Sequence, residues 1–198
     1  MDALIGSTGF VGGHLSRQHR FIAQFHSRNF SKAAGEHYQT VVCAAAPGSM
    51  FDANRFPKRD SQRVERLIEQ LTRITAERFV LISSIAVLAD SAGGDDESTT
   101  AFETDLAYGR HRRQLEVFCQ EQFADCLVVR LPALFGDGLK KNFLFDILNP
   151  VPSMLSDEAY QGFLQVLAPA LRDVLPTIYT WDPDLEMHSV DRMSLERS

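Results

Sequence analysis

The first twelve residues, Met1-Asp-Ala-Leu-Ile-Gly6-Ser-Thr-Gly9-Phe-Val-Gly12, decide the fold. The apolar residues 3–5 predict a strand, and three glycines follow it before the start of a predicted helix. At such a turn one glycine permits the tight bend, one lets the backbone approach a diphosphate, and one lets the helix pack against the strand. The alternative is an ordinary connection between a strand and a helix that holds no ligand.

Four further apolar segments predict strands at residues 21–26, 40–45, 79–83 and 126–130. Most of them lack alternation, which is typical of strands buried on both faces of a parallel sheet. Between them, residues 61–76 and 108–123 carry apolar side chains at helical spacing. Strands that alternate with helices predict an α/β fold of the Rossmann type, an open parallel sheet with helices on both faces.

The length of 198 residues suits one domain with a small appended lobe. We expect a nucleotide-binding domain over residues 1–148 and a small C-terminal lobe over residues 149–198. In the lobe, residues 157–175 have one helical pattern, and a polar tail begins at Asp182. Residues 90–105 are rich in Asp, Glu, Ser, Thr and Gly without a period, which predicts a long exposed loop.

Composition and charge exclude several classes of function. The net charge of −6 disfavours nonspecific binding to nucleic acid. No apolar run approaches the roughly 18–20 residues that span a membrane, and a strand at the N-terminus leaves no room for a signal peptide. Three cysteines without a C-x-x-C pair and six histidines without metal-binding spacing predict a reducing compartment and no metal site. We therefore expect a cytoplasmic chain.

The end of the second predicted strand bears on the choice of dinucleotide. About 20 residues after the first glycine, an NAD site usually places an acid on the ribose 2′-hydroxyl. Residues 26–29 read His-Ser-Arg-Asn and contain no acid. Arg28, helped by the Ser27 hydroxyl, suits a 2′-phosphate instead. The pattern favours NADP over NAD, and the alternative is that Arg28 is a solvated surface residue.

Ser84, Tyr108 and Arg112 are the candidate catalytic residues. A step of four residues puts Tyr108 and Arg112 on one face of a helix. A fixed positive charge lowers the pKa of a neighbouring phenol, as acid or base chemistry near neutral pH requires, and Ser84 at a strand end is placed to hold a substrate oxygen. The alternative is a surface pair on an amphipathic helix. His111 is expected to point away from Arg112.

In this order, these blocks resemble the short-chain dehydrogenase/reductase superfamily, in particular its extended branch of sugar-nucleotide epimerases and dehydratases. The resemblance covers residues 1–142. It implies that Ser84, Tyr108 and Arg112 occupy the catalytic serine and Tyr-x-x-x-Lys positions. It also implies a dinucleotide held by Gly6, Thr8, Gly9, Phe10, Val11, Gly12, Ala44, Ala45, Ala46 and Pro132, in addition to Ser27 and Arg28.

The chain departs from the family pattern at several places. Arg112 replaces the usual lysine, and Asp60 falls where the family commonly has an asparagine that organises a proton relay. Only residues 30–39 separate the second strand from the alanine-rich strand, which indicates a compact variant without the usual intervening strand and helix. The C-terminal lobe is also shorter than a sugar-nucleotide lobe.

The expected function is that of an NADP-dependent oxidoreductase or epimerase-like enzyme, acting on a hydroxyl or carbonyl carbon of a small or sugar-type substrate. A non-catalytic module of the same fold, which binds or senses the dinucleotide, is the alternative; a scaffold without a nucleotide is the third interpretation. Lys140, Lys141 and Asn142 are candidates for meeting a substrate phosphate, with a solvated turn as the alternative. By analogy with the superfamily, residues 108–123 are also a candidate helix for pairing in a homodimer.

Overall fold

The computed structural model describes the chain except for residues 91–93, 137, 140–151, 153 and 191–198. The chain divides into two compact units, Met1–Leu139 and Lys140–Ser198. The expected boundary between residues 148 and 149 lies outside the described residues, so that division stays a prediction. Within the described ranges, no helix is both long and apolar enough to cross a membrane.

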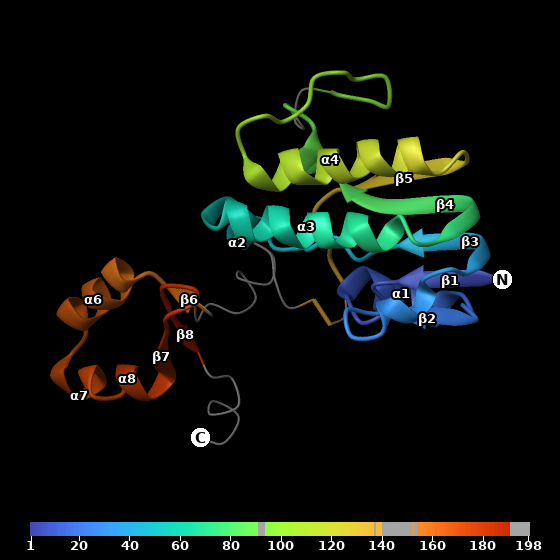
Figure 1. The fold of residues 1–198 in the computed structure, drawn as a ribbon. Coiled ribbons are helices and arrows are strands. Elements are labelled where there is room, and N and C mark those ends of the chain that lie inside the picture. The colour runs from blue at the N-terminus through green and yellow to red at the C-terminus, as the bar shows by residue number, and fades with distance from the viewer. Residues whose placement is uncertain (91–93, 137, 140–151, 153, 191–198) are drawn as a thin grey trace. The chain divides into compact units, whose positions relative to one another are not determined.

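The first unit contains a sheet of five parallel strands in the order β2-β1-β3-β4-β5 (Figure 1). Their bounds are β1 (Asp2–Ile5), β2 (Ala23–Phe25), β3 (His37–Cys43), β4 (Thr75–Ser84) and β5 (Cys126–Leu131). Ile5 is paired with Phe25 and with Cys43, and Ser84 is paired with Leu131. The carboxyl ends of these strands therefore lie along one edge of the sheet, which confirms the predicted Rossmann-type class.

The helices of this unit are α1 (Phe10–Gln18), α2 (Met50–Arg55), α3 (Pro57–Leu71) and α4 (Ala107–Gln122). The sheet grows in one direction from β1 to β2 and in the other from β3 to β5. Since crossovers between parallel strands are right-handed, this reversal places α1 on one face and α3 and α4 on the other. Only a short 3-10 helix, η1 (Phe30–Ala33), lies between β2 and β3. The compact connection expected from the sequence is therefore present.

The main core lies between the sheet and the pair of helices α3 and α4, which pack side by side (Figure 1). Helix α3 contributes Val64, Leu67 and Leu71, all on one face because they recur at helical spacing. Phe79 of β4 stacks on Phe123 with ring centroids 4.0 Å apart. Burial of each such side chain contributes about 1.5–3 kcal/mol, so these helices are held firmly against the sheet.

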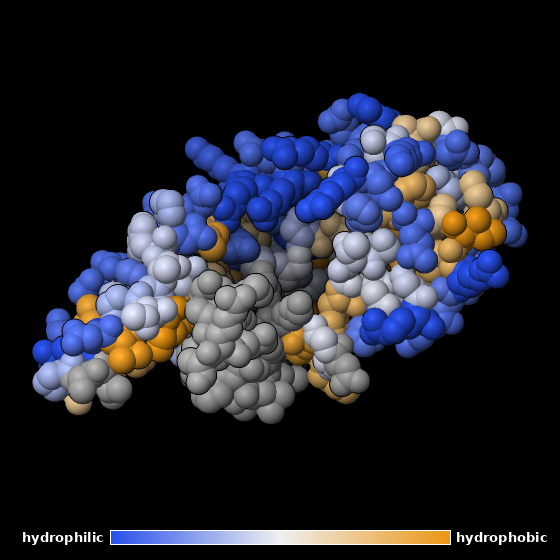
Figure 2. Space-filling view, turned by 90° about the horizontal axis from the view of Figure 1, so that it is seen from below, coloured by the Kyte–Doolittle hydropathy of each residue, from blue (hydrophilic) through white to orange (hydrophobic). Residues whose placement is uncertain are grey.

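Apolar side chains also reach the surface at scattered places among hydrophilic ones (Figure 2). Leu127 of β5 is 54% exposed, although its neighbours Cys126 and Val128 pack against the core. This alternation follows from the two faces of a strand, because successive side chains point to opposite sides of the sheet. Residues of β5 on the face opposite α3 and α4 are therefore less covered within the first unit.

Four expected elements, β2, β3, α3 and β4, have bounds in the first unit that differ by more than one residue from the expected ones. The helix predicted over residues 61–76 is wrong at its end, because α3 stops at Leu71 and β4 already begins at Thr75. Strand β3 begins earlier than expected, and β2 is shorter than residues 21–26. Helix α2 was not expected, since six residues are too few to show a period; its N-cap Ser49 accepts a hydrogen bond from the Asp52 amide at 3.2 Å.

The second unit contains a three-stranded antiparallel sheet in the order β6-β8-β7, together with short helices. The elements are β6 (Met154–Leu155), α6 (Asp157–Val166), α7 (Pro169–Arg172), α8 (Leu175–Ile178), β7 (Tyr179–Asp182) and β8 (Met187–Val190). The single helix predicted over residues 157–175 is wrong. Helix α6 ends before Pro169, because a proline ring disfavours helical geometry in the preceding residue.

The predicted polar tail from Asp182 is also wrong over its described part, since β7 and β8 form a hairpin there. Asp182 Oδ1 accepts hydrogen bonds from the amides of Asp184 and Leu185 at 2.9 and 3.2 Å, which closes the turn. The aromatic residues Tyr160 and Tyr179 are buried in the small core of this unit. The polar composition of this segment therefore gave no sign of the β7–β8 pair, which is stabilised by buried aromatic rings.

Candidate functional site

The sequence-predicted residues of the first unit gather at the carboxyl edge of its sheet. Gly6 follows β1, Ala44 follows β3, Ser84 ends β4 and Pro132 follows β5. The growth of the sheet reverses between β1 and β3, and ligands of open α/β sheets bind in the crevice at such a reversal. The glycine turn and the alanine segment flank this point.

The glycine turn is held tightly against the strand ends. Gly6 has a φ of +90°, which favours glycine, and a Cβ there would overlap the backbone of Ala44. A Cβ on Gly12 would overlap the Gly6 carbonyl oxygen. At Gly9, by contrast, the nearest atom to an added Cβ is 3.4 Å away, and this residue is exposed. Two glycines therefore serve packing, while the third leaves the backbone accessible.

Helix α1 begins at this turn with its amides directed out of its first turn. The first helical hydrogen bond runs from the Gly13 amide to the Gly9 carbonyl at 2.8 Å. The amides of Phe10, Val11 and Gly12 precede it and have no intrahelical acceptor. The first turn contains no acidic residue, so the positive end of the helix dipole is not compensated there. This cradle fits a diphosphate.

The end of β2 displays Ser27 and Arg28 on a compact turn. The His26 amide donates to Asn29 Oδ1 at 2.7 Å, and the Arg28 amide donates to His26 Nδ1 at 3.3 Å. Both Ser27 and Arg28 are exposed. The backbone of the turn is thus fixed while the guanidinium of Arg28 faces solvent, as a phosphate ligand would require.

The segment after β5 returns to the start of α1. Gly136 has a φ of +141°, and a Cβ there would lie 3.6 Å from the Phe10 ring and 3.9 Å from the His14 ring. Phe10 and His14 contact each other edge to face at 4.7 Å. Pro132, which the resemblance places near a nicotinamide, is exposed. This segment therefore borders the glycine turn.

The start of α4 lies against the segment that follows Ser84. A Cβ on Gly109 would overlap the Ala86 carbonyl oxygen and approach Glu103 Cγ at 2.7 Å, so glycine is what permits this approach. The Tyr108 amide donates to Asn54 Oδ1 of α2 at 2.9 Å. Ser84 Oγ accepts a hydrogen bond from the Ala86 amide at 3.2 Å. Ser84 and Tyr108 are thus carried by neighbouring backbone segments.

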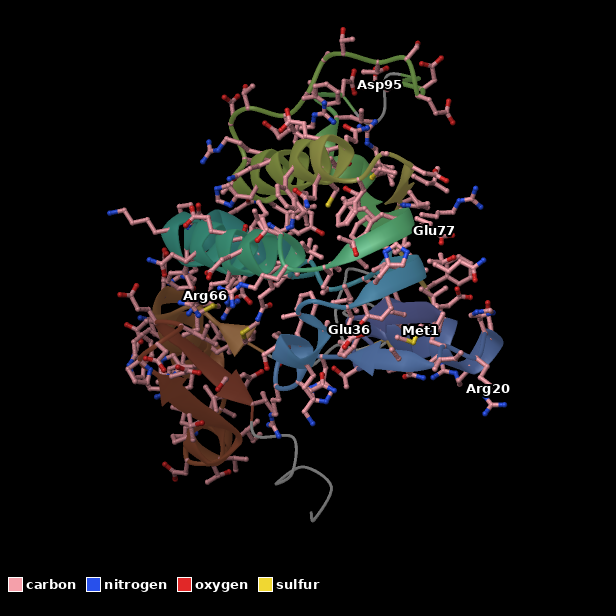
Figure 3. The ribbon with its side chains drawn as sticks, turned by 45° about the vertical axis from the view of Figure 1, so that its right-hand side comes forward. Met1, Arg20, Glu36, Arg66, Glu77 and Asp95 are labelled. Carbon is pink, nitrogen blue, oxygen red and sulfur yellow. The ribbon has the colours of Figure 1, made fainter. Side chains whose placement is uncertain are left out.

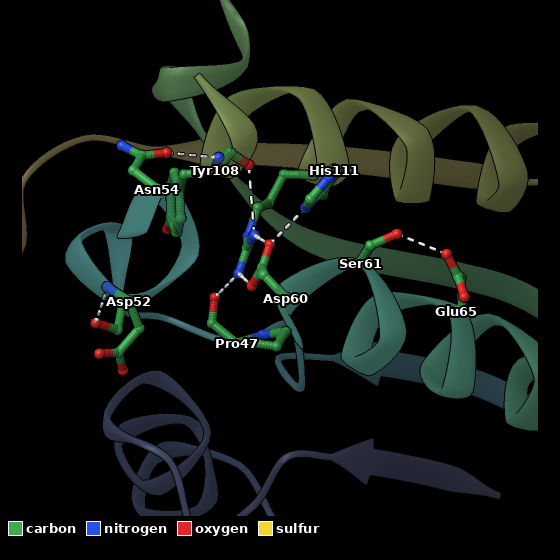
Figure 4. A network of polar contacts seen from close by, with 10 residues as sticks. Pro47, Asp52, Asn54, Asp60, Ser61, Glu65, Tyr108 and His111 are labelled. Atoms are coloured by element: carbon green, nitrogen blue, oxygen red, sulfur yellow. Dashed lines mark hydrogen bonds and ion pairs between the residues drawn. The ribbon is translucent and has the colours of Figure 1, made fainter. Parts of the chain in front are cut away.

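Arg112 lies inside a polar cluster with Asp60, His111, Tyr108 and the Pro47 carbonyl (Figure 4). Its Nη2 donates to Asp60 Oδ1 at 3.0 Å, its Nη1 donates to Asp60 Oδ2, and its Nη2 also reaches the Pro47 carbonyl. Arg112 is only 2% exposed. The terminal nitrogens that a ribose contact would use are therefore occupied by protein oxygens.

His111 also binds Asp60, through Nδ1 to Oδ2 at 2.7 Å, and it is buried. The expectation that His111 points away from Arg112 is wrong, because both side chains converge on one carboxylate. Burial by itself raises the pKa of Asp60, but hydrogen bonds from Arg112 and His111 outweigh burial, so the pKa of Asp60 is lowered. Asp60 is therefore ionised near neutral pH.

A second buried carboxylate, Glu116, connects α4 with the sheet. It accepts hydrogen bonds from Ser83 at 2.6 Å, from Arg113 at 2.9 Å and from Arg130 at 2.8 and 3.0 Å. The guanidinium carbons of Arg113 and Arg130 lie 3.9 and 5.5 Å from the ring centroid of Phe102. This cluster fixes the end of the long loop before α4 beside the strand that ends in Ser84.

Over the residues that the structure describes, no group of three or more His, Cys, Asp or Glu is placed to hold a metal ion. Lys140, Lys141 and Asn142 lie outside the described residues. Asp95 lies at the far end of the loop before α4, away from α4 itself (Figure 3).

Comparisons with known proteins fit this geometry. A model of the NAD dependent epimerase/dehydratase family matches residues 25–151, which is more than half of the chain. The chain belongs to this family. The family match confirms the resemblance that the sequence blocks indicated. A comparison with curated proteins gives no match.

Solved structures of other proteins share the fold of this family member. The dTDP-4-dehydrorhamnose reductase of Clostridium acetobutylicum matches with a TM-score of 0.58 and 18% identity, over 76% of this chain and 59% of that chain. The reductase of the same name from Bacillus anthracis, solved with NADP, matches with a TM-score of 0.60 and 17% identity, over 75% of this chain and 59% of that chain. A UDP-galactose 4-epimerase matches with a TM-score of 0.60 and 19% identity, over 76% of this chain and 62% of that chain. The chain spans about three fifths of the length of these proteins.

Three contributors to the site were missed in the sequence. Asn54 lies on the unexpected helix α2, Gly109 follows Tyr108 directly, and Pro47 contributes only a carbonyl oxygen. Gly109 could have been found, because glycine is unfavourable inside a helix and its presence there indicates a close approach. The other two contacts join residues far apart in the sequence and leave no local pattern.

Proposed function

We propose that the first unit binds NADP(H) with the glycine turn at the start of α1. The observation that carries the proposal is the packing of Gly6 and Gly12 against backbone, which leaves the first amides of α1 at the reversal point of the sheet. The family description supports a nicotinamide dinucleotide. Two structures of the same fold, from Bacillus anthracis and Pseudomonas aeruginosa, were solved with NADP and NADPH.

Within this proposal, the family residues have separate roles. The backbone of residues 8–12 binds the diphosphate, and Ala44, Ala45 and Ala46 let the dinucleotide lie along the end of β3. Ser27 and Arg28 hold a 2′-phosphate, which favours NADP over NAD. Pro132 borders the nicotinamide. When bound, the dinucleotide supplies or accepts a hydride.

We further propose that Tyr108 exchanges a proton with the substrate oxygen and that Ser84 orients this oxygen. Because Ser84 Oγ accepts from the Ala86 amide, its own hydroxyl hydrogen remains available to donate. The substrate would carry a hydroxyl or carbonyl carbon, as in a small or sugar-type molecule. The names of the similar structures, dTDP-4-dehydrorhamnose reductase and UDP-galactose 4-epimerase, support a sugar. The cytoplasmic location and the homodimer stay predictions.

A second candidate function is that of a dinucleotide-binding module without turnover. The burial of Arg112 and the engagement of its terminal nitrogens with Asp60 and Pro47 favour this candidate, because no terminal donor is left for a ribose. The remaining donor of Arg112, Nε, is buried and has no hydrogen-bond partner among the described residues.

The test combines binding with turnover. NADPH and NADH are titrated by fluorescence, and NADPH oxidation is then followed with a panel of carbonyl substrates, including nucleotide-linked keto sugars. Tyr108→Phe is compared with Tyr160→Phe, which removes the same hydroxyl from the second unit. We expect Tyr108→Phe to lower turnover at least 100-fold, which is typical of a lost proton-transfer group, with Tyr160→Phe unchanged.

Each outcome discriminates between the candidates. Equal loss in both tyrosine variants would rule out the proposed chemistry. Binding of NADPH without oxidation by any substrate of the panel would favour the module, and absence of binding to either dinucleotide would reject both candidates.

A further inference from the structure

Tyr108 is held by three contacts, one from Asn54 and two from Arg112 of the cluster around Asp60. The Tyr108 amide donates to Asn54, its carbonyl accepts from Arg112 Nη1 at 3.4 Å, and its ring lies 4.1 Å from the guanidinium carbon of Arg112. A guanidinium at this distance from a ring face is attracted by the π electrons. The orientation of the phenol therefore depends on where Arg112 is held.

Asp60 fixes the position of the Arg112 guanidinium. Its carboxylate is 4% exposed and receives both terminal nitrogens of Arg112 together with His111 Nδ1. A two-pronged contact of this kind fixes the plane of the guanidinium as well as its position. Asp60 lies on the buried face of α3, one turn before Val64 of the core, so the carboxylate itself is held by a well-packed helix.

The same guanidinium reaches the strand end beside the glycine turn. Arg112 Nη2 donates to the carbonyl of Pro47, which follows Ala44–Ala46 directly. The backbone of Ala44 is what a Cβ on Gly6 would overlap. Arg112 thus connects the segment along the cofactor edge with the first turn of α4, in which Tyr108 lies.

From these contacts we propose that Asp60 and Arg112 form a charge-neutral clamp that positions Tyr108, and that Arg112 does not contact the dinucleotide. This inference rests on the proposed function only for its consequence in catalysis. Arg112 carries a permanent positive charge beside the phenol, and the carboxylate of Asp60 offsets this charge. Asp60 and Arg112 are therefore positioning residues, and their effect reaches the reacting atoms through Tyr108.

The first experiment measures NADPH affinity. Arg112→Met alone would leave Asp60 as a buried unpaired charge and could unfold the protein, so the probe is the double variant Asp60→Asn with Arg112→Met. We expect its dissociation constant for NADPH to stay within about threefold of the original chain, whereas Arg28→Ala raises it at least tenfold, as loss of a charge-assisted contact does. A tenfold or larger loss in a folded double variant would overturn the proposal.

The second experiment needs neither dinucleotide nor substrate. Absorbance at the phenolate band is followed with rising pH, and the same titration of a Tyr108→Phe partner is subtracted to isolate Tyr108 from the other three tyrosines. Arg112, Asp60 and His111 are the charged or titratable groups of the cluster. In Asp60→Asn the arginine charge is no longer offset, so we expect the Tyr108 signal to rise at a lower pH than in the original chain.

A merely structural role for Asp60 predicts no such shift toward lower pH. An unchanged or later rise in a folded Asp60→Asn variant would overturn the clamp. Asp60→Glu, which keeps the charge, is expected to restore the original titration. Failure of the proposed function gives a different result. In that case the original chain binds no NADPH, while the absorbance titrations still behave as described.

Discussion

At the scale of single residues, the close approach of Gly109 to the Ala86 carbonyl can be tested by substitution. A methyl group there would overlap the Ala86 carbonyl, so Gly109→Ala must push α4 away from the segment after Ser84. Overpacking of this kind costs about 1–3 kcal/mol, and backbone on one side leaves little room for relief. We expect a clearly lower melting temperature by circular dichroism, together with a displaced Tyr108 and reduced turnover.

Gly13→Ala is the matched control, because a Cβ at Gly13 in α1 would meet nothing closer than 3.8 Å. Alanine also favours a helix interior by about 0.5–1 kcal/mol relative to glycine. This variant should be as stable as the original chain or slightly more stable. Equal melting temperatures for the two alanine variants would contradict the close approach of α4.

Arg28 is the residue on which the choice of dinucleotide depends. Loss of a charge-assisted contact weakens binding by about 1.5–3 kcal/mol, so Arg28→Ala should weaken NADPH by at least tenfold and leave NADH nearly unchanged. Arg20→Ala removes the same charge at the opposite end of the sheet, near Met1 (Figure 3), and should change neither affinity. If fluorescence titration finds NADPH and NADH weakened equally, the 2′-phosphate assignment is wrong.

The positions of Tyr108 and Arg112 on one helical face follow from spacing alone, and the structure agrees, since the guanidinium stacks on the ring. The burial of Arg112 does not follow from the sequence. An arginine in an amphipathic pattern indicates an exposed face, and the partner that draws it inside, Asp60, lies on another helix far along the chain. Long-range ion pairs of this kind have no local signature.

At the scale of elements, β1, β4, β5 and the two long helices were predictable because their apolar residues recur with the period of each structure. The end of α3 could not be predicted in this way, because Ile74 and Ala76 continue the apolar pattern of the helix. In the structure, Ile74 already belongs to the turn that leads into β4. The β7–β8 hairpin was missed because its turn and one face are polar. Periodicity therefore located elements better than it located their ends.

Glu116 ties α4 to β4 and β5, which gives the fold a dependence on pH. Burial by itself raises the pKa of Glu116, but hydrogen bonds from Arg130, Ser83 and Arg113 outweigh burial and lower it below 4.5. A lowered folded pKa means that stability is present above the unfolded value and is lost as pH falls through the folded one. The contribution of Glu116 should therefore persist at neutral pH and disappear on acidification below about pH 4.5.

Glu116→Gln should cost about 3 kcal/mol at neutral pH, because it leaves the arginines beside a neutral amide in a buried place. The difference in melting temperature from the original chain should shrink as the pH falls from about 7 to about 3. Glu121→Gln, an exposed change on the same helix, should show no such difference. A constant difference across this range would mean that Glu116 acts through packing instead of charge.

At the scale of the whole molecule, the proposed functions concentrate in one part of the chain. Every residue proposed for the dinucleotide and for proton exchange lies within Met1–Leu139, and so do the clusters around Asp60 and Glu116. This unit also contains the larger core, with buried residues from β1, β2, β3 and β4 and partly buried side chains of β5 packed against them. A core of this size is sufficient for independent folding of about 140 residues.

We therefore expect a fragment of residues 1–148 to unfold cooperatively. Its affinity for NADPH should stay within about threefold of that of the full chain, a difference of about 0.7 kcal/mol. Circular dichroism melting and fluorescence titration on both proteins measure this directly. Turnover of the fragment is measured beside that of the full chain with the same substrates. A fragment that folds but no longer binds NADPH would place part of the dinucleotide site beyond residue 148, and one that does not fold would refute the expected domain division.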